Sequence, residues 1–184
     1  KDGAIDRQLY RSDLDGGRLL RLTLEPGTHD VELSPDGSLF LDRFSSLTSP
    51  PEVRLCERDG TIVKVLAKSE VAAEIDLASW ELHRVPARDG FELDVAVLKP
   101  VPFDPRRGYP LWLSTYSGPD LPSLVNRWAP SAWHQFLAQN GVIVLQLNVR
   151  TAAAIGREVS GRCHKRLGAQ ELAGIEDAVA WVGK

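Results

Sequence analysis

Three tight-turn signals divide the first third of this chain into short strands. Each is an Asp-Gly pair: Asp15-Gly16, Asp36-Gly37 and Asp59-Gly60. Such a pair supplies the positive φ that a tight hairpin needs, and the segments between the pairs carry short runs of strand-forming residues. The pattern predicts an antiparallel meander, with strands near residues 29–33, 38–45, 52–57 and 61–66 preceded by a hairpin over residues 7–23.

The pattern changes after residue 80, where longer apolar runs appear. Residues 80–85 and 91–98 predict a second hairpin. Residues 111–116 and 142–147 predict two continuous apolar strands, which are typical of a sheet that is covered on both faces.

Two helices are predicted in the same half. The first follows Ser131 and stops at Asn140-Gly141, and the second spans residues 169–182. The apolar sides that we expect to be buried are Trp133, Phe136 and Leu137 in the first helix, and Leu172, Ile175, Val179 and Val182 in the second. The order hairpin, strand, helix, strand, helix is that of the front half of an α/β-hydrolase fold, whose next strand leads into the nucleophile elbow.

We therefore expect a mixed β and α/β fold in three parts. Residues 1–68 are predicted to form the C-terminal part of a β-propeller, about one blade plus a hairpin, although a small β-sandwich fits the same turns. Residues 69–79 lose the strand pattern and predict a linker. Residues 80–184 are predicted to form the N-terminal half of an α/β-hydrolase domain, truncated before the nucleophile elbow. The strand at 111–116 would then leave an apolar edge, so we expect the isolated chain to aggregate or to be partly molten.

Composition argues against several classes of function. The net charge of −3 is small, and no run of Lys and Arg is long enough to follow a nucleic-acid backbone or an anionic membrane surface. No apolar run reaches the roughly 18 residues that a membrane-spanning helix needs. The four histidines lack metal-ligand spacing, and the glycines at 156 and 161 lack the lysine and Ser/Thr of a phosphate-binding loop. We therefore expect no metal and no cofactor.

The first candidate site residue is a tyrosine at the end of a predicted strand. Tyr116 closes the apolar run that begins at Leu111, and it precedes Gly118-Pro119. Enzymes with α/β sheets place reacting groups outside the carboxyl ends of their strands. No two glycines stand four residues apart, so the Gly-x-Ser-x-Gly elbow that carries an α/β-hydrolase serine does not occur in this chain.

Two stretches carry a resemblance to a known family. Tyr116-Ser117-Gly118-Pro119 and His164-Lys165-Arg166-Leu167-Gly168, with the acidic helix that follows, are similar to the prolyl oligopeptidase family of serine peptidases and specifically to its dipeptidyl-peptidase IV branch. Members of that family join a β-propeller to a C-terminal α/β-hydrolase domain. The resemblance implies that this chain is a fragment, holding the end of the propeller and the front half of the hydrolase domain. It is good over residues 80–182 and weaker over residues 7–66.

The resemblance also implies roles for four residues. Tyr116 falls on the family's oxyanion tyrosine, whose phenol hydroxyl helps to hold the negative oxygen formed during acyl transfer, and a phenol is a neutral donor at pH 7. Ser117, Gly118 and Arg150 are expected to contribute to substrate binding. The catalytic serine, aspartate and histidine of the family, and the glutamates that hold a substrate's amino group, are expected to lie outside this chain.

One loop departs from the family pattern. Relatives carry Asp-x-Arg-Gly-x-Gly where this chain reads Asn148-Val149-Arg150-Thr151-Ala152-Ala153. If the positions of Thr151 and Ala153 need a positive φ, each replacement of glycine strains the loop. The acidic residues of the last helix, Glu171, Glu176 and Asp177, are expected to form a solvated face.

The leading hypothesis is that the chain is a segment of a serine exopeptidase that removes dipeptides from peptide N-termini, and that the segment alone is inactive. Its expected partners are a peptide substrate, the remainder of the parent enzyme and, as a further option, a second copy of that enzyme. Two alternatives stay open. One is a non-catalytic relative that binds proteins, which the altered loop at 151–155 motivates, and the other is an acylaminoacyl peptidase or esterase on the same scaffold.

Overall fold

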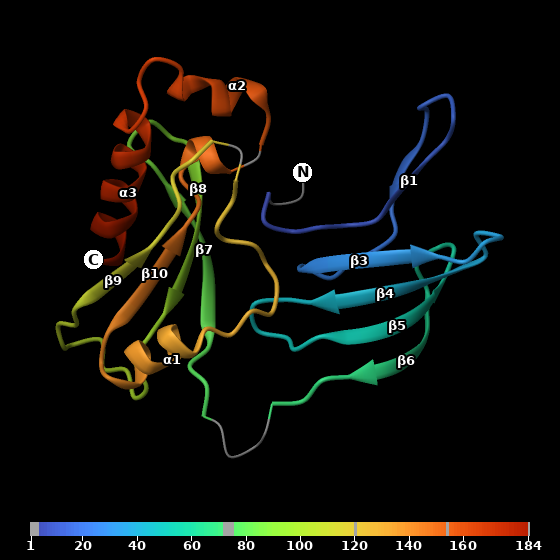
Figure 1. Cartoon of the computed structure of the whole chain (residues 1–184), viewed down its shortest axis with the longest axis horizontal. Coiled ribbons are helices and arrows are strands. Elements are labelled where there is room, and N and C mark those ends of the chain that lie inside the picture. Colours follow the sequence, from blue (N-terminus) through green and yellow to red (C-terminus); the bar gives the residue numbers. More distant parts are fainter. Residues whose placement is uncertain (1–3, 72–75, 120, 154, 184) are drawn as a thin grey trace. The chain divides into compact units, whose positions relative to one another are not determined.

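The computed structural model describes residues 4–71, 76–119, 121–153 and 155–183 (Figure 1). The chain divides into two compact units. The first comprises residues 1–76 together with 125–129, and the second comprises residues 77–124 and 130–184. The sequence did not predict that residues 125–129 belong to the first unit.

The first unit is built from two antiparallel sheets. The smaller one pairs β1 (Tyr10–Ser12) with β2 (Leu19–Arg21), and the larger one has four strands in the order β3-β4-β5-β6. Those four strands are β3 (Thr28–Leu33), β4 (Leu39–Ser45), β5 (Glu52–Glu57) and β6 (Ile62–Lys68). The predicted meander and its preceding hairpin are confirmed. Gly16, Gly37 and Gly60 have φ values of 77°, 66° and 97°, the left-handed conformation that the Asp-Gly turns predicted.

Residues 125–129 are held in the first unit mainly through Asn126. Its side-chain Oδ1 accepts a hydrogen bond from the backbone N–H of Leu47 at 3.0 Å, and its Nδ2 donates to Asp6 at 2.8 Å. The Thr28 hydroxyl donates to the Asn126 carbonyl at 2.9 Å. The Asn126 side chain is almost completely buried. Loss of this side chain would therefore remove a partner from the partly buried Leu47 N–H and from the Asp6 carboxylate.

The second unit is a four-stranded sheet in the order β7-β8-β10-β9. Its strands are β7 (Trp80–Pro86), β8 (Glu92–Leu98), β9 (Leu111–Ser114) and β10 (Ile143–Leu147). Strands β9 and β10 are parallel, whereas β7 pairs with β8, and β8 with β10, in antiparallel fashion. The predicted strand at 111–116 is shorter than expected, because pairing with β10 ends at Ser114.

Helices cover both faces of this sheet. They are α1 (Ala132–Gln139), the short α2 (Arg157–Ser160) and α3 (Ala169–Val182), with 3-10 turns η1 (Arg150–Ala152) and η2 (Gly161–Cys163). On one face, Ala178 of α3 joins the buried cluster that contains Val95 and Leu147. On the other face, His134 of α1 contacts the Trp80 ring edge-on, and Trp80 lies opposite Leu98 in the β7–β8 ladder. Successive side chains of a strand point to opposite faces, so α1 and α3 pack on opposite sides of the sheet.

The predicted apolar side of each helix is partly wrong. In α1, Trp133 and Phe136 are exposed, and the buried residues are Gln135, Leu137 and Ala138. In α3, Leu172 is exposed and Val179 largely so, while Glu171, Gly174 and Ala178 are buried. The predicted Leu137 is buried, and Ile175 and Val182 pack against the core. Each helix also packs small or hydrogen-bonded residues inward and exposes some of its large apolar residues, which an apolar-periodicity argument does not detect.

Candidate functional site

The candidate site lies where the two parallel strands end. Carboxyl ends of parallel strands meet at one edge of a sheet, and Tyr116 follows β9 while Asn148 follows β10. The two strand ends are joined by the Thr115 hydroxyl, which donates a hydrogen bond to the Leu147 carbonyl at 3.1 Å. This bond fixes the residue directly before the candidate tyrosine.

The ring of Tyr116 rests against Gly118. A Cβ atom placed on Gly118 would lie only 2.5 Å from both Cε1 and the hydroxyl oxygen of the Tyr116 ring. The ring is half-exposed, with 50% of its residue surface accessible, so the phenol is available to solvent or to a ligand. Ser117, between them, is partly buried. The structure thus brings Tyr116, Ser117 and Gly118 together, and only a residue without a side chain allows this ring position.

Asn148 ties the far end of the same loop to β10. Its side-chain Oδ1 accepts from the backbone N–H groups of Ser123 and Leu124, both at 2.9 Å, and its Nδ2 donates to the Leu124 carbonyl at 2.7 Å. Gln146 adds a bond from Nε2 to the Ser123 carbonyl at 2.9 Å. Sequence analysis missed Asn148 as a site residue. Its position directly after an apolar strand is the signal that would have pointed to it.

Arg150 is engaged by the turn between β7 and β8. Its guanidinium is almost completely buried, forms an ion pair with Asp89 and stacks over the Phe91 ring at 4.4 Å. The hydrogen bond from Arg150 lowers the pKa of the Asp89 carboxyl to about 2. These contacts position the guanidinium within its own unit, and a role for Arg150 in substrate binding remains a prediction.

The loop after Arg150 is not strained in the way the sequence analysis considered. Thr151 lies in the 3-10 turn η1, Ala153 has a φ of −74°, and Lys165 is the one non-glycine with positive φ among the described residues. The Thr151 hydroxyl instead donates to Glu171 at 2.6 Å, and the other oxygen of Glu171 accepts from the Gly168 N–H at 2.9 Å. Both side chains are buried.

The expectation of a solvated acidic face on α3 is therefore wrong for Glu171. It is also wrong for Asp177, whose side chain is mostly buried and accepts from the Arg88 backbone and guanidinium. Glu176 is exposed and pairs with the same arginine. Glu171 and Asp177 hold α3 to its neighbours through these hydrogen bonds, since a buried carboxylate is tolerated only when it is hydrogen-bonded.

A cavity of the second unit lies at the opposite edge of the sheet. It has a volume of about 640 Å³, and its lining includes Phe103, Tyr109, Leu111, Ile143 and Trp181. Leu111 and Ile143 are the first residues of β9 and β10. The cavity thus marks the amino ends of the parallel strands, whereas ligands of open α/β sheets bind outside the carboxyl ends.

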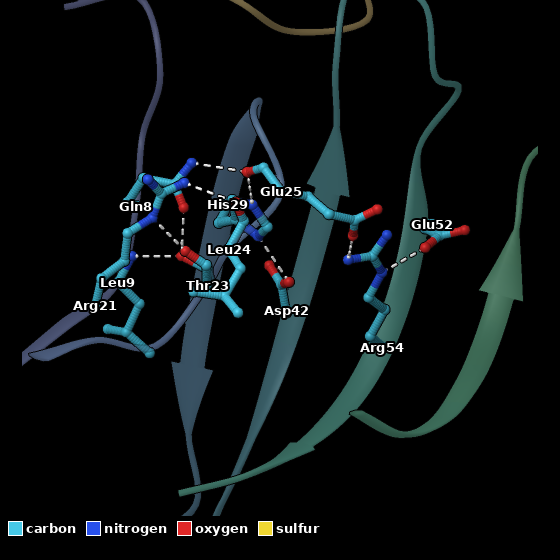
Figure 2. Close-up of polar contacts among 10 residues, drawn as sticks. All are labelled: Gln8, Leu9, Arg21, Thr23, Leu24, Glu25, His29, Asp42, Glu52 and Arg54. Carbon is cyan, nitrogen blue, oxygen red and sulfur yellow. Dashed lines mark hydrogen bonds and ion pairs between the residues drawn. The ribbon is translucent and has the colours of Figure 1, made fainter. Parts of the chain in front are cut away.

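The first unit contains a buried polar cluster (Figure 2). His29 Nδ1 lies 2.8 Å from a carboxylate oxygen of Asp42, and its Nε2 lies 3.1 Å from the Glu25 carbonyl. The buried guanidinium of Arg54 forms ion pairs with the carboxylates of Glu25 and Glu52. The second oxygen of Asp42 is buried without a hydrogen-bond partner within the described part of the chain.

This cluster lines a cavity of about 290 Å³, which also includes Cys56. Burial, and next the charge of Asp42, raise the pKa of the Cys56 thiol, which disfavours the reactive thiolate. The ion pairs of the cluster join Arg54 to the two glutamates and His29 to Asp42, so its charged groups have partners, as a buried structural network requires. The residues at the ends of β9 and β10 therefore stay the candidate site.

The described residues include both cysteines of the chain. Within them, no group of three or more His, Cys, Asp or Glu is arranged to hold a metal ion, and both Cys56 and Cys163 are free thiols. Burial lowers the pKa of His134, a residue of α1 that packs against Trp80 of β7. None of the helices in the described ranges is long and apolar enough to cross a membrane.

Comparisons with known proteins agree with the resemblance expected from the motifs. No family model matches the chain. It is 29% identical to a probable dipeptidyl-aminopeptidase B of Aspergillus oryzae, across 100% of this chain and 21% of that protein. It is 28% identical to a protein of the same name from Emericella nidulans, across 89% of this chain and 18% of that protein.

Solved structures give the same picture. Porphyromonas gingivalis dipeptidyl peptidase 4 matches with a TM-score of 0.85 and 26% identity, covering 98% of this chain and 26% of that one. A putative dipeptidyl aminopeptidase IV from Bacteroides ovatus matches with a TM-score of 0.83 and 21% identity, covering 95% of this chain and 26% of that one. The similarity to dipeptidyl peptidase IV is thus confirmed, and the chain spans about a fifth to a quarter of these relatives.

Proposed function

We propose that this chain is part of a serine-type dipeptidyl peptidase and supplies its oxyanion donor, Tyr116. In this proposal the four-stranded β3–β6 sheet is a propeller blade and the second unit is the front half of an α/β-hydrolase domain. The observation that carries the proposal is the half-exposed Tyr116 phenol at the carboxyl end of β9, with its ring resting against Gly118. The similarity to dipeptidyl peptidases across nearly the whole chain supports the choice of substrate class.

The proposed reaction is acyl transfer. A serine from the remainder of the parent enzyme attacks the scissile carbonyl carbon while a histidine takes its proton, and the carbonyl π electrons move onto the oxygen. The Tyr116 hydroxyl donates a hydrogen bond to that oxyanion. Collapse of the tetrahedral intermediate breaks the C–N bond, the histidine protonates the departing amine, and water then hydrolyses the acyl-enzyme. A donor placed where negative charge develops stabilises the transition state more than the substrate.

The proposal is tested with the full-length parent protein and a Gly-Pro chromogenic substrate. Removing one oxyanion donor typically lowers kcat by about 10²–10³, so Tyr116→Phe is expected to lose that factor while retaining its folded structure. Tyr10→Phe, which changes an exposed tyrosine of β1, is the matched control and should keep full activity. Unchanged kcat in Tyr116→Phe would refute the assignment.

The non-catalytic alternative predicts no hydrolysis by the parent protein and no Gly-x-Ser-x-Gly in its sequence. Its motivation is weaker than before, because Thr151 and Ala153 occupy an ordinary, hydrogen-bonded turn. An acylaminoacyl peptidase or esterase would hydrolyse an acylated amino acid or a simple ester in preference to the Gly-Pro substrate. The isolated 184-residue chain is expected to hydrolyse none of these substrates, because it lacks the nucleophile elbow.

A further inference from the structure

We infer that Asn148 is a positioning residue for Tyr116, acting through the loop that follows β9. This inference rests on the proposed role of the Tyr116 phenol. Asn148 is 1% exposed and uses both ends of its side-chain amide on the backbone of residues 123–124. The side-chain amide of Asn148 accepts from the Leu124 N–H and donates to the Leu124 carbonyl. It thus satisfies both backbone groups of Leu124, as a neighbouring strand does in a sheet.

Two residues that flank the Tyr116 loop, Thr115 and Ser123, are bonded to the end of β10. On the near side, Thr115 donates to the Leu147 carbonyl at 3.1 Å. On the far side, Ser123 donates to the same carbonyl at 3.3 Å and is held by Asn148. Residue 148 thus closes a loop whose other tether immediately precedes Tyr116.

Loss of the Asn148 amide would remove three of the hydrogen bonds that hold the far side. The N–H groups of Ser123 and Leu124 would lose their acceptor, and Leu124 is completely buried, so they could regain hydrogen bonds only if the chain moved. The far end would keep only the bonds that join Ser123 to the Leu147 carbonyl and to Gln146. Displacement of a catalytic donor by about 1 Å can cost on the order of 10² in rate.

The test is a double-mutant cycle in the full-length parent protein. If Asn148 acts through the phenol, Asn148→Ala should lower kcat by about 10- to 100-fold in the wild-type background, and by no more than about 3-fold in a Tyr116→Phe background. Equal loss in the two backgrounds would overturn the inference, because a purely structural defect does not depend on the phenol. Asn148→Asp, which keeps the two acceptor contacts, should fall between wild type and Asn148→Ala.

Asn140→Ala is the matched control. Asn140 also donates from its side-chain amide to a backbone carbonyl, that of Phe136 at 2.8 Å, but it does so at the end of α1. It should leave kcat unchanged in both backgrounds.

A second measurement separates this inference from the proposed function. With 3-fluorotyrosine placed at position 116 of the full-length protein, Asn148→Ala should shift or broaden the ¹⁹F resonance, whether or not the protein hydrolyses peptides. An unchanged resonance would overturn the positioning role. A shifted resonance in a protein without peptidase activity would sustain it and refute the proposed function alone.

Discussion

Replacing Gly118 with alanine probes the site with a single methyl group. The new Cβ would lie 2.5 Å from the Tyr116 hydroxyl oxygen, about 0.9 Å inside the 3.4 Å at which ordinary van der Waals contact begins. The ring must therefore withdraw by about that distance. Gly118 does not have a positive φ, so alanine fits its backbone. The ring is half-exposed and can swing toward solvent, so the change in the free energy of unfolding should stay within about 0.5 kcal/mol.

The expected result is a loss of function without a loss of stability. A displacement of about 1 Å at a catalytic donor can cost on the order of 10² in rate, so kcat for the Gly-Pro substrate should fall by about that factor. Steady-state kinetics and thermal unfolding of the full-length protein measure the two quantities. Gly108→Ala is the control, because a Cβ there meets nothing within 4 Å. If Gly118→Ala retains more than half of the wild-type kcat, the phenol does not act from this position.

Two further predictions concern stability. Gly174→Ala should stabilise the protein by up to about 1 kcal/mol in urea unfolding, since alanine favours the helix and its Cβ would lie at an acceptable 3.5 Å from Leu93; destabilisation would show that α3 packs more tightly than described. The hydrogen bond from Arg150 lowers the pKa of Asp89 from 3.8 to about 2, so the ionised Asp89 carboxylate stabilises the folded state above about pH 4 and this stabilisation is lost as the pH falls toward 2. The difference in the free energy of unfolding between wild type and Asp89→Asn should therefore close over that range. A constant difference would contradict the ion pair.

The backbone of this chain was largely predictable from local signals. Strands in the first unit fall within one or two residues of the predicted ranges, because Asp-Gly pairs fix where each hairpin turns. The bounds of α3 were predicted correctly, since a glycine before it and another after it mark its ends. These features depend on residues that are close in sequence.

The helix faces could not be predicted in the same way. Trp133 and Phe136 stack on each other at 5.7 Å, and Trp112 of β9 meets Trp133 edge-on at 5.8 Å, so the three form an exposed aromatic cluster. Apolar spacing shows that such residues share a side of the helix, but not that a neighbour covers that side. Gln135 is buried instead because its side chain forms two hydrogen bonds with the backbone of Ala78, 57 residues away.

The candidate site divides along the same line. Tyr116 could be found from the sequence because its evidence is local: an apolar run, a phenol and a Gly-Pro turn. The buried contact between Glu171 and the Thr151 hydroxyl could not be predicted, because it joins residues 20 positions apart. The partners of Asn148 lie 24 and 25 residues away, so its contacts could not be predicted either. A polar residue at the first position after a parallel strand is nevertheless placed at the edge where α/β enzymes work. Had that rule been applied to β10 as it was to β9, the sequence alone would have nominated Asn148.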